Sequence, residues 1–87
     1  MEKLLLLSAA WLLQLSIANA QAADSLAALL AIAPADTHRV TLLTDYAWEI
    51  SESETDKAEI KINEALALAQ KLSFKKGEAT AWNGLGV

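Results

Sequence analysis

The spacing of the apolar residues is the feature that most constrains the fold of this chain. Leucine, isoleucine, valine and alanine recur three or four positions apart in successive segments between residues 24 and 72, which is the period of a helix with one buried face. No segment shows a sustained alternation of apolar and polar residues, the pattern of a half-buried strand. The sequence therefore predicts an all-α protein.

A first short helix is predicted directly before Pro34. The side-chain oxygens of Asp24 and Ser25 can accept the first unpaired backbone N–H groups of a helix. The residue before a proline is disfavoured in helical conformation, so this helix should end at Pro34. One apolar stripe is expected to be buried, and it comprises Leu26, Leu29, Leu30 and Ala33.

A second helix is predicted after Pro34. Asp36 and Thr37 are its capping candidates, and it should end in the polar and acidic run of residues 51–55. Its apolar stripe comprises Val40, Leu43, Ala47 and Ile50, with Tyr46 and Trp48 beside it.

A third and a fourth helix complete the predicted arrangement. Ser53 or Thr55 is expected to cap the third, and a short connection ending at Gly77 should lead into the fourth from Glu78 onward. The expected buried stripe of the third helix comprises Ala58, Ile62, Ala65, Leu66, Ala69 and Leu72, and its expected solvated face comprises Lys57, Lys61, Glu64 and Lys71. Since the connections are short, consecutive helices should pack as antiparallel neighbours.

The first 20 residues predict a secretory signal peptide. Lys3 precedes an apolar run, and the segment ends in Ala-Asn-Ala, the small-x-small pattern found before a cleavage site. Cleavage is expected between Ala20 and Gln21, which implies an exported protein that is periplasmic or membrane-associated. Residues 4–20 are marginally short for a spanning helix, which needs about 20 apolar residues. An uncleaved membrane anchor and a buried helix remain the alternatives.

Charge and cysteine content exclude some kinds of partner and site. The net charge is −4, and the only basic pair is Lys75–Lys76, whereas nucleic-acid binding needs clustered lysine and arginine. We therefore expect no nucleic-acid partner. The chain has no cysteine, so neither a disulfide framework nor a thiolate metal site is predicted.

No catalytic or metal-binding constellation is found in the sequence, so no enzyme, cofactor or metal is predicted within these residues. His38 is the only histidine and is interpreted as an exposed polar residue. Asp45 and Glu49 lie one helical turn apart and could mimic an acid–base pair, but such pairs are common on solvated helices. Ser51 and Ser53 have no histidine nearby in the sequence to act as a base.

Two glycines and two tryptophans suggest two further kinds of site. Gly84 and Gly86 could begin a nucleotide-binding G-x-G-x-x-G loop, but that motif should follow a strand. Gly86 is instead predicted to be a position of close approach between paired helices. Trp48 and Trp82 could form a ligand platform, although a core position is the commoner one for aromatics in helical repeats.

The last residues carry a resemblance to a known family. Residues 82–86, WNGLG, match W-x2-L-G, the opening of the first helix of the tetratricopeptide repeat. Upstream, Ala58 and Ile62, with Ala65 after them, resemble the second helix of that repeat. In the preceding unit Leu43, Tyr46, Ala47 and Ile50 would take the tryptophan, leucine, glycine and tyrosine positions. The spacing from Ala47 to Gly86 exceeds the usual period of about 34 residues.

The resemblance implies a solenoid of antiparallel helix pairs. Residues 21–35 would form a leading helix and linker, and residues 36–87 would form one complete repeat and one truncated repeat. The residues expected to pack the repeats together are Leu43, Tyr46, Ala47, Ile50, Ala58, Ile62, Ala65, Leu66, Trp82, Leu85 and Gly86. About three repeats are needed for a stable array, so the sequence is expected to be the N-terminal piece of a longer protein.

The same resemblance implies a function. The chain is similar to exported tetratricopeptide modules that bind a protein or peptide partner. The alternative is the sensory region of a membrane-bound histidine kinase, cyclase or transcription regulator whose output domain lies beyond these residues. In both cases the membrane would be reached only through the N-terminal segment or a downstream span.

Overall fold

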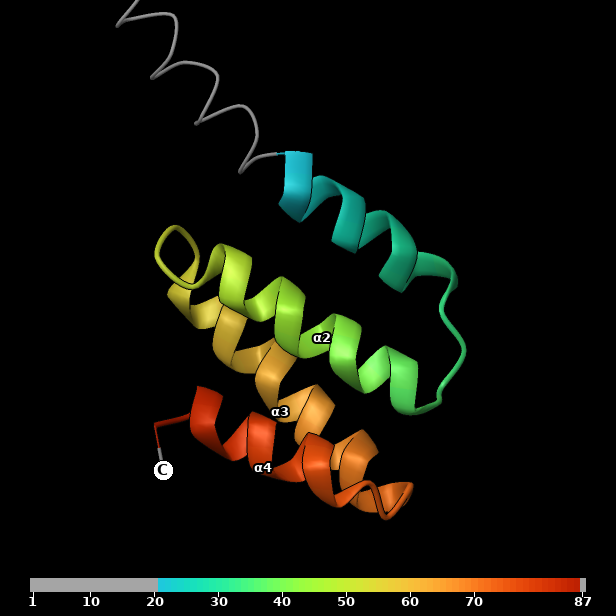
Figure 1. The fold of residues 1–87 in the computed structure, drawn as a ribbon. Helices are drawn as coiled ribbons and strands as arrows, with labels where there is room; N and C mark the ends of the chain where they lie inside the picture. The colour runs from blue at the N-terminus through green and yellow to red at the C-terminus, as the bar shows by residue number, and fades with distance from the viewer. Residues whose placement is uncertain (1–20, 87) are drawn as a thin grey trace, which may run out of the picture.

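The computed structural model describes residues 21–86, which form four packed helices (Figure 1). The first covers residues 21–32 and is called helix 21–32 below. It is followed by α2 (Thr37–Ile50), α3 (Thr55–Lys71) and α4 (Lys75–Gly84). No strand occurs in this part of the chain, so the predicted all-α class is confirmed. The predicted signal peptide, residues 1–20, lies outside the described residues.

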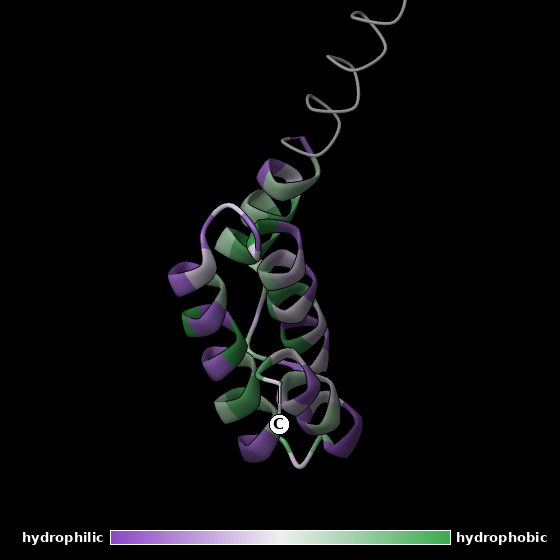
Figure 2. Ribbon diagram, turned by 90° about the vertical axis from the view of Figure 1, so that its left-hand side faces the viewer, coloured by the Kyte–Doolittle hydropathy of each residue, from purple (hydrophilic) through white to green (hydrophobic). Residues whose placement is uncertain are grey.

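Successive helices run in opposite directions (Figure 1). α2 packs against α3, α3 packs against α4, and α4 also contacts α2. Helix 21–32 lies along the side of α2 that faces away from α4 (Figure 1). Figure 2 shows that each turn of the helices carries both hydrophobic and hydrophilic residues, as expected for helices that each bury one side.

The core between the helices is built mainly of small and branched residues. Ala47 of α2, Ala65 and Ala69 of α3, and Ala81 of α4 are each 0% exposed. Short side chains at these positions let the helix axes approach closely, while larger side chains fill the remaining space. The other buried apolar residues are Leu30, Val40, Leu42, Leu43, Tyr46, Ile50, Ala58 and Leu66.

The start of α2 agrees with the sequence, whereas the start of the preceding helix does not. Asp36 is the N-cap of α2, and its carboxylate Oδ1 accepts a 3.1 Å hydrogen bond from the backbone N–H of Arg39. The chain is already helical at residue 21, so Asp24 and Ser25 lie inside a helix and their predicted capping role is wrong. Helix 21–32 ends two residues before Pro34, as the proline rule predicts.

The predicted caps of the third helix are also wrong. The N-cap position of α3 is Glu54, which makes no side-chain capping bond. The hydroxyls of Ser53 and Thr55 instead donate backward, to the carbonyls of Ile50 at 3.4 Å and Ser51 at 2.9 Å. Such local bonds to the preceding turn compete with capping. Both hydroxyls therefore satisfy carbonyls at the end of α2 and not the free N–H groups of α3.

The glycines of the last helix have different roles from those expected. Gly77 lies inside α4 and is buried, although the sequence placed it before the helix. A Cβ there would lie 2.5 Å from Cδ2 of Phe74 and 2.8 Å from Cγ1 of Val40, so α4 approaches α2 closely at this point. Gly86 lies beyond α4 with φ of +79° and nothing within 4 Å of an added Cβ. The predicted close approach at Gly86 is therefore wrong, because the left-handed backbone there follows the end of the helix.

Several large apolar residues that were expected in the core are exposed. Leu29 and Leu72 were placed on buried stripes but are 47% and 37% exposed. Trp48 and Trp82 are 77% and 42% exposed, so the expectation of core positions is wrong for both tryptophans. Periodicity shows that a helix has an apolar side, but it does not reveal how fully the neighbouring helices cover each residue.

Arg39 attaches helix 21–32 to α2. Its guanidinium Nη1 donates two hydrogen bonds of 2.9 Å, to the carbonyl oxygens of Leu30 and Ala33. The last carbonyls of a helix have no partner within the helix, and a cation at this end also opposes the helix dipole. Arg39, in the first turn of α2, thereby supplies the hydrogen-bond donors that the carbonyls at the end of helix 21–32 lack.

Candidate interaction groove

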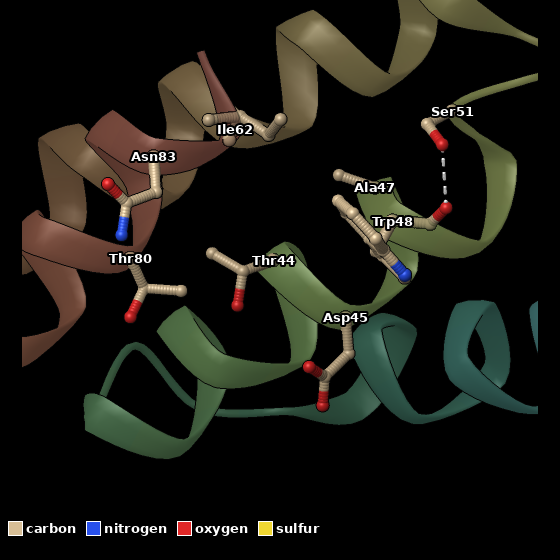
Figure 3. Close-up of a pocket in the computed structure, with 9 residues that line it drawn as sticks. Thr44, Asp45, Ala47, Trp48, Ser51, Ile62, Thr80 and Asn83 are labelled. Atoms are coloured by element: carbon tan, nitrogen blue, oxygen red, sulfur yellow. Dashed lines mark hydrogen bonds between the residues drawn. The ribbon is translucent and has the colours of Figure 1, made fainter. Parts of the chain in front are cut away.

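A groove runs between α2 and α4, with α3 at its base (Figure 3). Its volume is about 490 Å³, and it is open to the surface. The lining residues come from all three helices and the turn after α2, and they are Thr44, Asp45, Ala47, Trp48, Ser51, Ile62, Thr80, Asn83 and Gly84. These residues are called the groove below.

The helical period explains which side chains line the two walls. Thr44 and Trp48 are four positions apart on α2, and Thr80 and Asn83 are three positions apart on α4, so each pair lies on one side of its helix. Thr44 and Thr80 lie opposite each other across the groove (Figure 3). Polar side chains thus occupy the facing walls.

Small residues create the space at the base of the groove. Ala47 of α2 is fully buried at the base of the groove, and because Gly84 has no side chain, Ile62 of α3 can lie against α4 there. An added Cβ on Gly84 would lie 3.0 Å from Cδ1 of Ile62. Bulkier side chains at Ala47 and Gly84 would make the groove shallower.

Trp48 forms one end of the groove with its ring exposed to solvent. Trp48 is 77% exposed, whereas tryptophan is highly buried on average. The Ser51 hydroxyl donates a 2.9 Å hydrogen bond to the Trp48 carbonyl oxygen (Figure 3), and the Ser51 backbone N–H donates to the same oxygen at 3.3 Å. These bonds fix the backbone where α2 ends and so hold the base of the tryptophan in place.

The surroundings of Trp48 are acidic. Asp45 lines the groove on one side of the indole, and Glu49 and Glu52 line a second hollow that Trp48 also borders. Residues 40–56 contain five carboxylates and neither lysine nor arginine. Within residues 21–86 the ion pairs occur elsewhere, at Lys61–Glu64 and Lys75–Glu78. The negative charge beside Trp48 is therefore not neutralised within the described chain.

Tyr46 offers a contrast to Trp48 on the same helix. The Nζ of Lys57 lies 5.6 Å from the centroid of the Tyr46 ring, within the range of a cation–π contact. Hydrogen bonding with Tyr46 and the negative charge of Glu54 raise the pKa of Lys57 above 10.5. Tyr46 thus has a cation of its own chain over its ring, and Trp48 has none among the described residues.

The polar residues considered as catalytic candidates are dispersed. His38 is exposed at the start of α2, and Asp45 and Glu49 are both exposed. The hydroxyls of Ser51 and Ser53 donate to the backbone carbonyls of the turn after α2. No group of three metal-ligating side chains is found within residues 21–86. The groove presents an aromatic face, hydroxyls, an amide and a carboxylate to its opening.

The residues predicted to pack the repeats divide into three groups. Seven are buried: Leu43, Tyr46, Ala47, Ile50, Ala58, Ala65 and Leu66. Ile62 and Leu85 are partly buried and pack against the core, while Trp82 and Gly86 are exposed. The prediction did not include Thr44, Thr80 and Asn83 of the groove, although their helical spacing on the polar sides of α2 and α4 was available as a signal.

None of the helices in the described part of the chain has the length and apolar character needed to cross a membrane. No protein-family model matches the sequence, and no match was found among curated proteins or solved structures. The resemblance to the tetratricopeptide repeat therefore stays a prediction that rests on the residues quoted for it.

Proposed function

We propose that this chain is an exported helical-repeat module that binds an extended peptide segment of another protein. The observation that carries the proposal is the open groove between α2 and α4, whose facing walls are lined by Thr44, Thr80 and Asn83. Polar groups on two rigid helices can pair with a peptide backbone, and an exposed aromatic at one end supplies apolar contact area.

The helix arrangement supports a tetratricopeptide-like interpretation of the same surface. α2 and α3 would form one complete hairpin, and α4 would be the first helix of the next hairpin. α4 packs against both helices of the preceding hairpin, as a repeat that contacts its neighbour does. The fully buried Ala47 and Ala65 permit the close approach that this stacking needs. In this interpretation the groove lies between the first helices of adjacent repeats.

Peptide selection on the full chain tests the proposed function. Random dodecapeptides displayed on phage would be selected on the immobilised protein, and the selected peptides would then be measured by fluorescence anisotropy. Thr80→Tyr places a bulky side chain on the wall of the groove, and Ala79→Tyr places the same side chain on an exposed position of α4 outside the groove. We expect at least about tenfold weaker binding for T80Y, the effect of losing about 1.4 kcal/mol, and no change for A79Y.

Two results would contradict this proposal. One is a selection that yields no peptide above background, and the other is an equal loss of affinity in both tyrosine variants. Circular dichroism of each variant establishes that helix content is retained.

Export is tested separately. The mature protein recovered from an exporting bacterial host should begin at Gln21, as measured by intact mass and N-terminal sequencing. A mature protein that retains residues 1–20 would favour the uncleaved anchor instead.

A further inference from the structure

Trp48 and the carboxylates beside it form a surface that none of the other residues described in the structure covers. It is called the Trp48 patch and comprises Asp45, Trp48, Glu49 and Glu52. The patch is continuous with the groove, because Asp45 and Trp48 line both. It therefore sits where one end of a bound peptide would lie.

Two properties of the patch restrict the chemistry of a partner. Trp48 is 77% exposed, and the face of its indole can hold a cation, for which tryptophan is the best of the aromatic side chains. The carboxylates of Asp45, Glu49 and Glu52 have no cationic partner within residues 21–86. An anionic or purely apolar segment would have to desolvate these charges without compensation, whereas a cationic side chain would pair with them.

We infer that the Trp48 patch receives an arginine side chain of the peptide bound in the groove. This inference rests on the proposed function, because it names the partner chemistry of the same surface. The planar guanidinium can stack on the indole and donate parallel hydrogen bonds to a carboxylate. A lysine ammonium is a compact point charge that cannot do both in the same way.

The position of the patch on α2 fits this assignment. Asp45 lies one turn before Trp48 and lines the groove with it, and Glu49 and Glu52 line the second hollow with it. Each of the two hollows that Trp48 borders therefore contains at least one carboxylate that a guanidinium could pair with. The hydrogen bonds from Ser51 to the Trp48 carbonyl hold the end of α2, which carries Asp45, Trp48 and Glu49, and the turn after it, which carries Glu52.

Peptides selected on the full chain provide the probe. For each selected peptide whose binding is weakened by T80Y but not by A79Y, the arginine would be replaced by citrulline, which is uncharged and has nearly the same shape, and in a second series by lysine. We expect citrulline to weaken binding at least about fivefold and lysine to weaken it less. Trp48→Ala is expected to weaken binding of the arginine peptide to a similar extent.

A double-substitution cycle separates the patch from the rest of the groove. In the variant Asp45→Asn with Glu49→Gln, the arginine and citrulline peptides should bind with nearly equal affinity, because the interaction that distinguishes them has been removed. The matched control is Glu64→Gln on α3, outside the patch, which should leave the preference for arginine unchanged.

The outcomes distinguish the two proposals. Groove-dependent peptides that contain no basic residue, or that tolerate citrulline, would overturn the inference and leave the proposed function intact. The absence of any groove-dependent peptide would overturn both. Concentration-dependent self-association in sedimentation velocity that T80Y abolishes would assign the groove to a second copy of the chain and would also overturn the inference.

Discussion

Gly77→Ala is expected to destabilise the protein although it replaces glycine by the best helix former. Gly77 lies in the first turn of α4 and faces α2. A Cβ at this position would lie 2.8 Å from Cγ1 of Val40 and 2.5 Å from Cδ2 of Phe74. Both separations are shorter than an ordinary contact between carbon atoms, about 3.5–4.0 Å, so at least one neighbour would have to move.

The magnitude follows from two opposing effects. Alanine in place of glycine stabilises a helix interior by about 1 kcal/mol, and by less in the first turn. Extra volume in a packed core costs about 1–3 kcal/mol. Val40 is 0% exposed and β-branched, which leaves it one favoured rotamer in a helix, so we expect the cost to lie in the upper part of that range. The net loss should be about 1–2 kcal/mol, which lowers the Tm by about 5–15 °C for a domain of this size.

Thermal and urea unfolding of the full chain, followed by circular dichroism at 222 nm, measure this change. Gly84→Ala is the matched control. Its Cβ would meet only the side chain of Ile62, with the flexible Cδ1 at 3.0 Å and with Cγ1 and Cγ2 at 3.5 Å, so the stability of this variant should stay within about 0.5 kcal/mol of the parent. The double variant of Gly77→Ala with Val40→Ala should lose less stability than the sum of the single variants. A Tm for G77A at or above that of the parent, or strict additivity in the double variant, would refute the reasoning.

Three further predictions concern the helix ends and one surface contact. Arg39→Met should release helix 21–32, because methionine has no N–H group to donate to the two terminal carbonyls that Arg39 holds; backbone amides of that helix should exchange faster while those of α3 are unchanged. Asp36→Ala should cost about 1 kcal/mol of unfolding free energy through loss of the N-cap, and Asp36→Asn should restore most of it in urea titrations. The pKa of Lys57 is raised above 10.5 by Tyr46, so Lys57 stabilises the fold at pH below 10.5 and this contribution is lost as the pH rises through the raised pKa. In Tyr46→Phe the pKa of Lys57, measured by NMR titration of its 13Cε shift, should fall toward 10.5; an unchanged value would contradict the assigned cause.

Much of the helical structure could be read from local sequence. The apolar stripe of α2 and the Asp36 cap were predicted, as was the end of the first helix near Pro34. These features depend on interactions within one turn or one helix face, such as a side-chain oxygen accepting a nearby N–H or the steric restriction before proline. Each is determined by residues that are close together in the chain.

The errors concern contacts between helices. Gly86 and Gly77 are both glycines near the C-terminus, but only Gly77 meets a neighbouring helix, because Val40 lies directly opposite it. Trp48 was expected in the core, and the rotation of α2 relative to α3 and α4 instead turns it outward to 77% exposure. No pattern within either helix distinguishes these outcomes.

The groove likewise combines features that local sequence determines with features that depend on contacts between helices. The sequence determined that α2 and α4 are helices with a polar side, and it determined that five carboxylates and no basic residue lie between residues 40 and 56. Only the tertiary structure decided that Thr44 and Thr80 line opposite walls of one groove and that Trp48 borders it. The physical reason is that hydrogen bonds and apolar periodicity fix each helix locally, whereas the direction of a side chain relative to other helices depends on how the buried surfaces fit together.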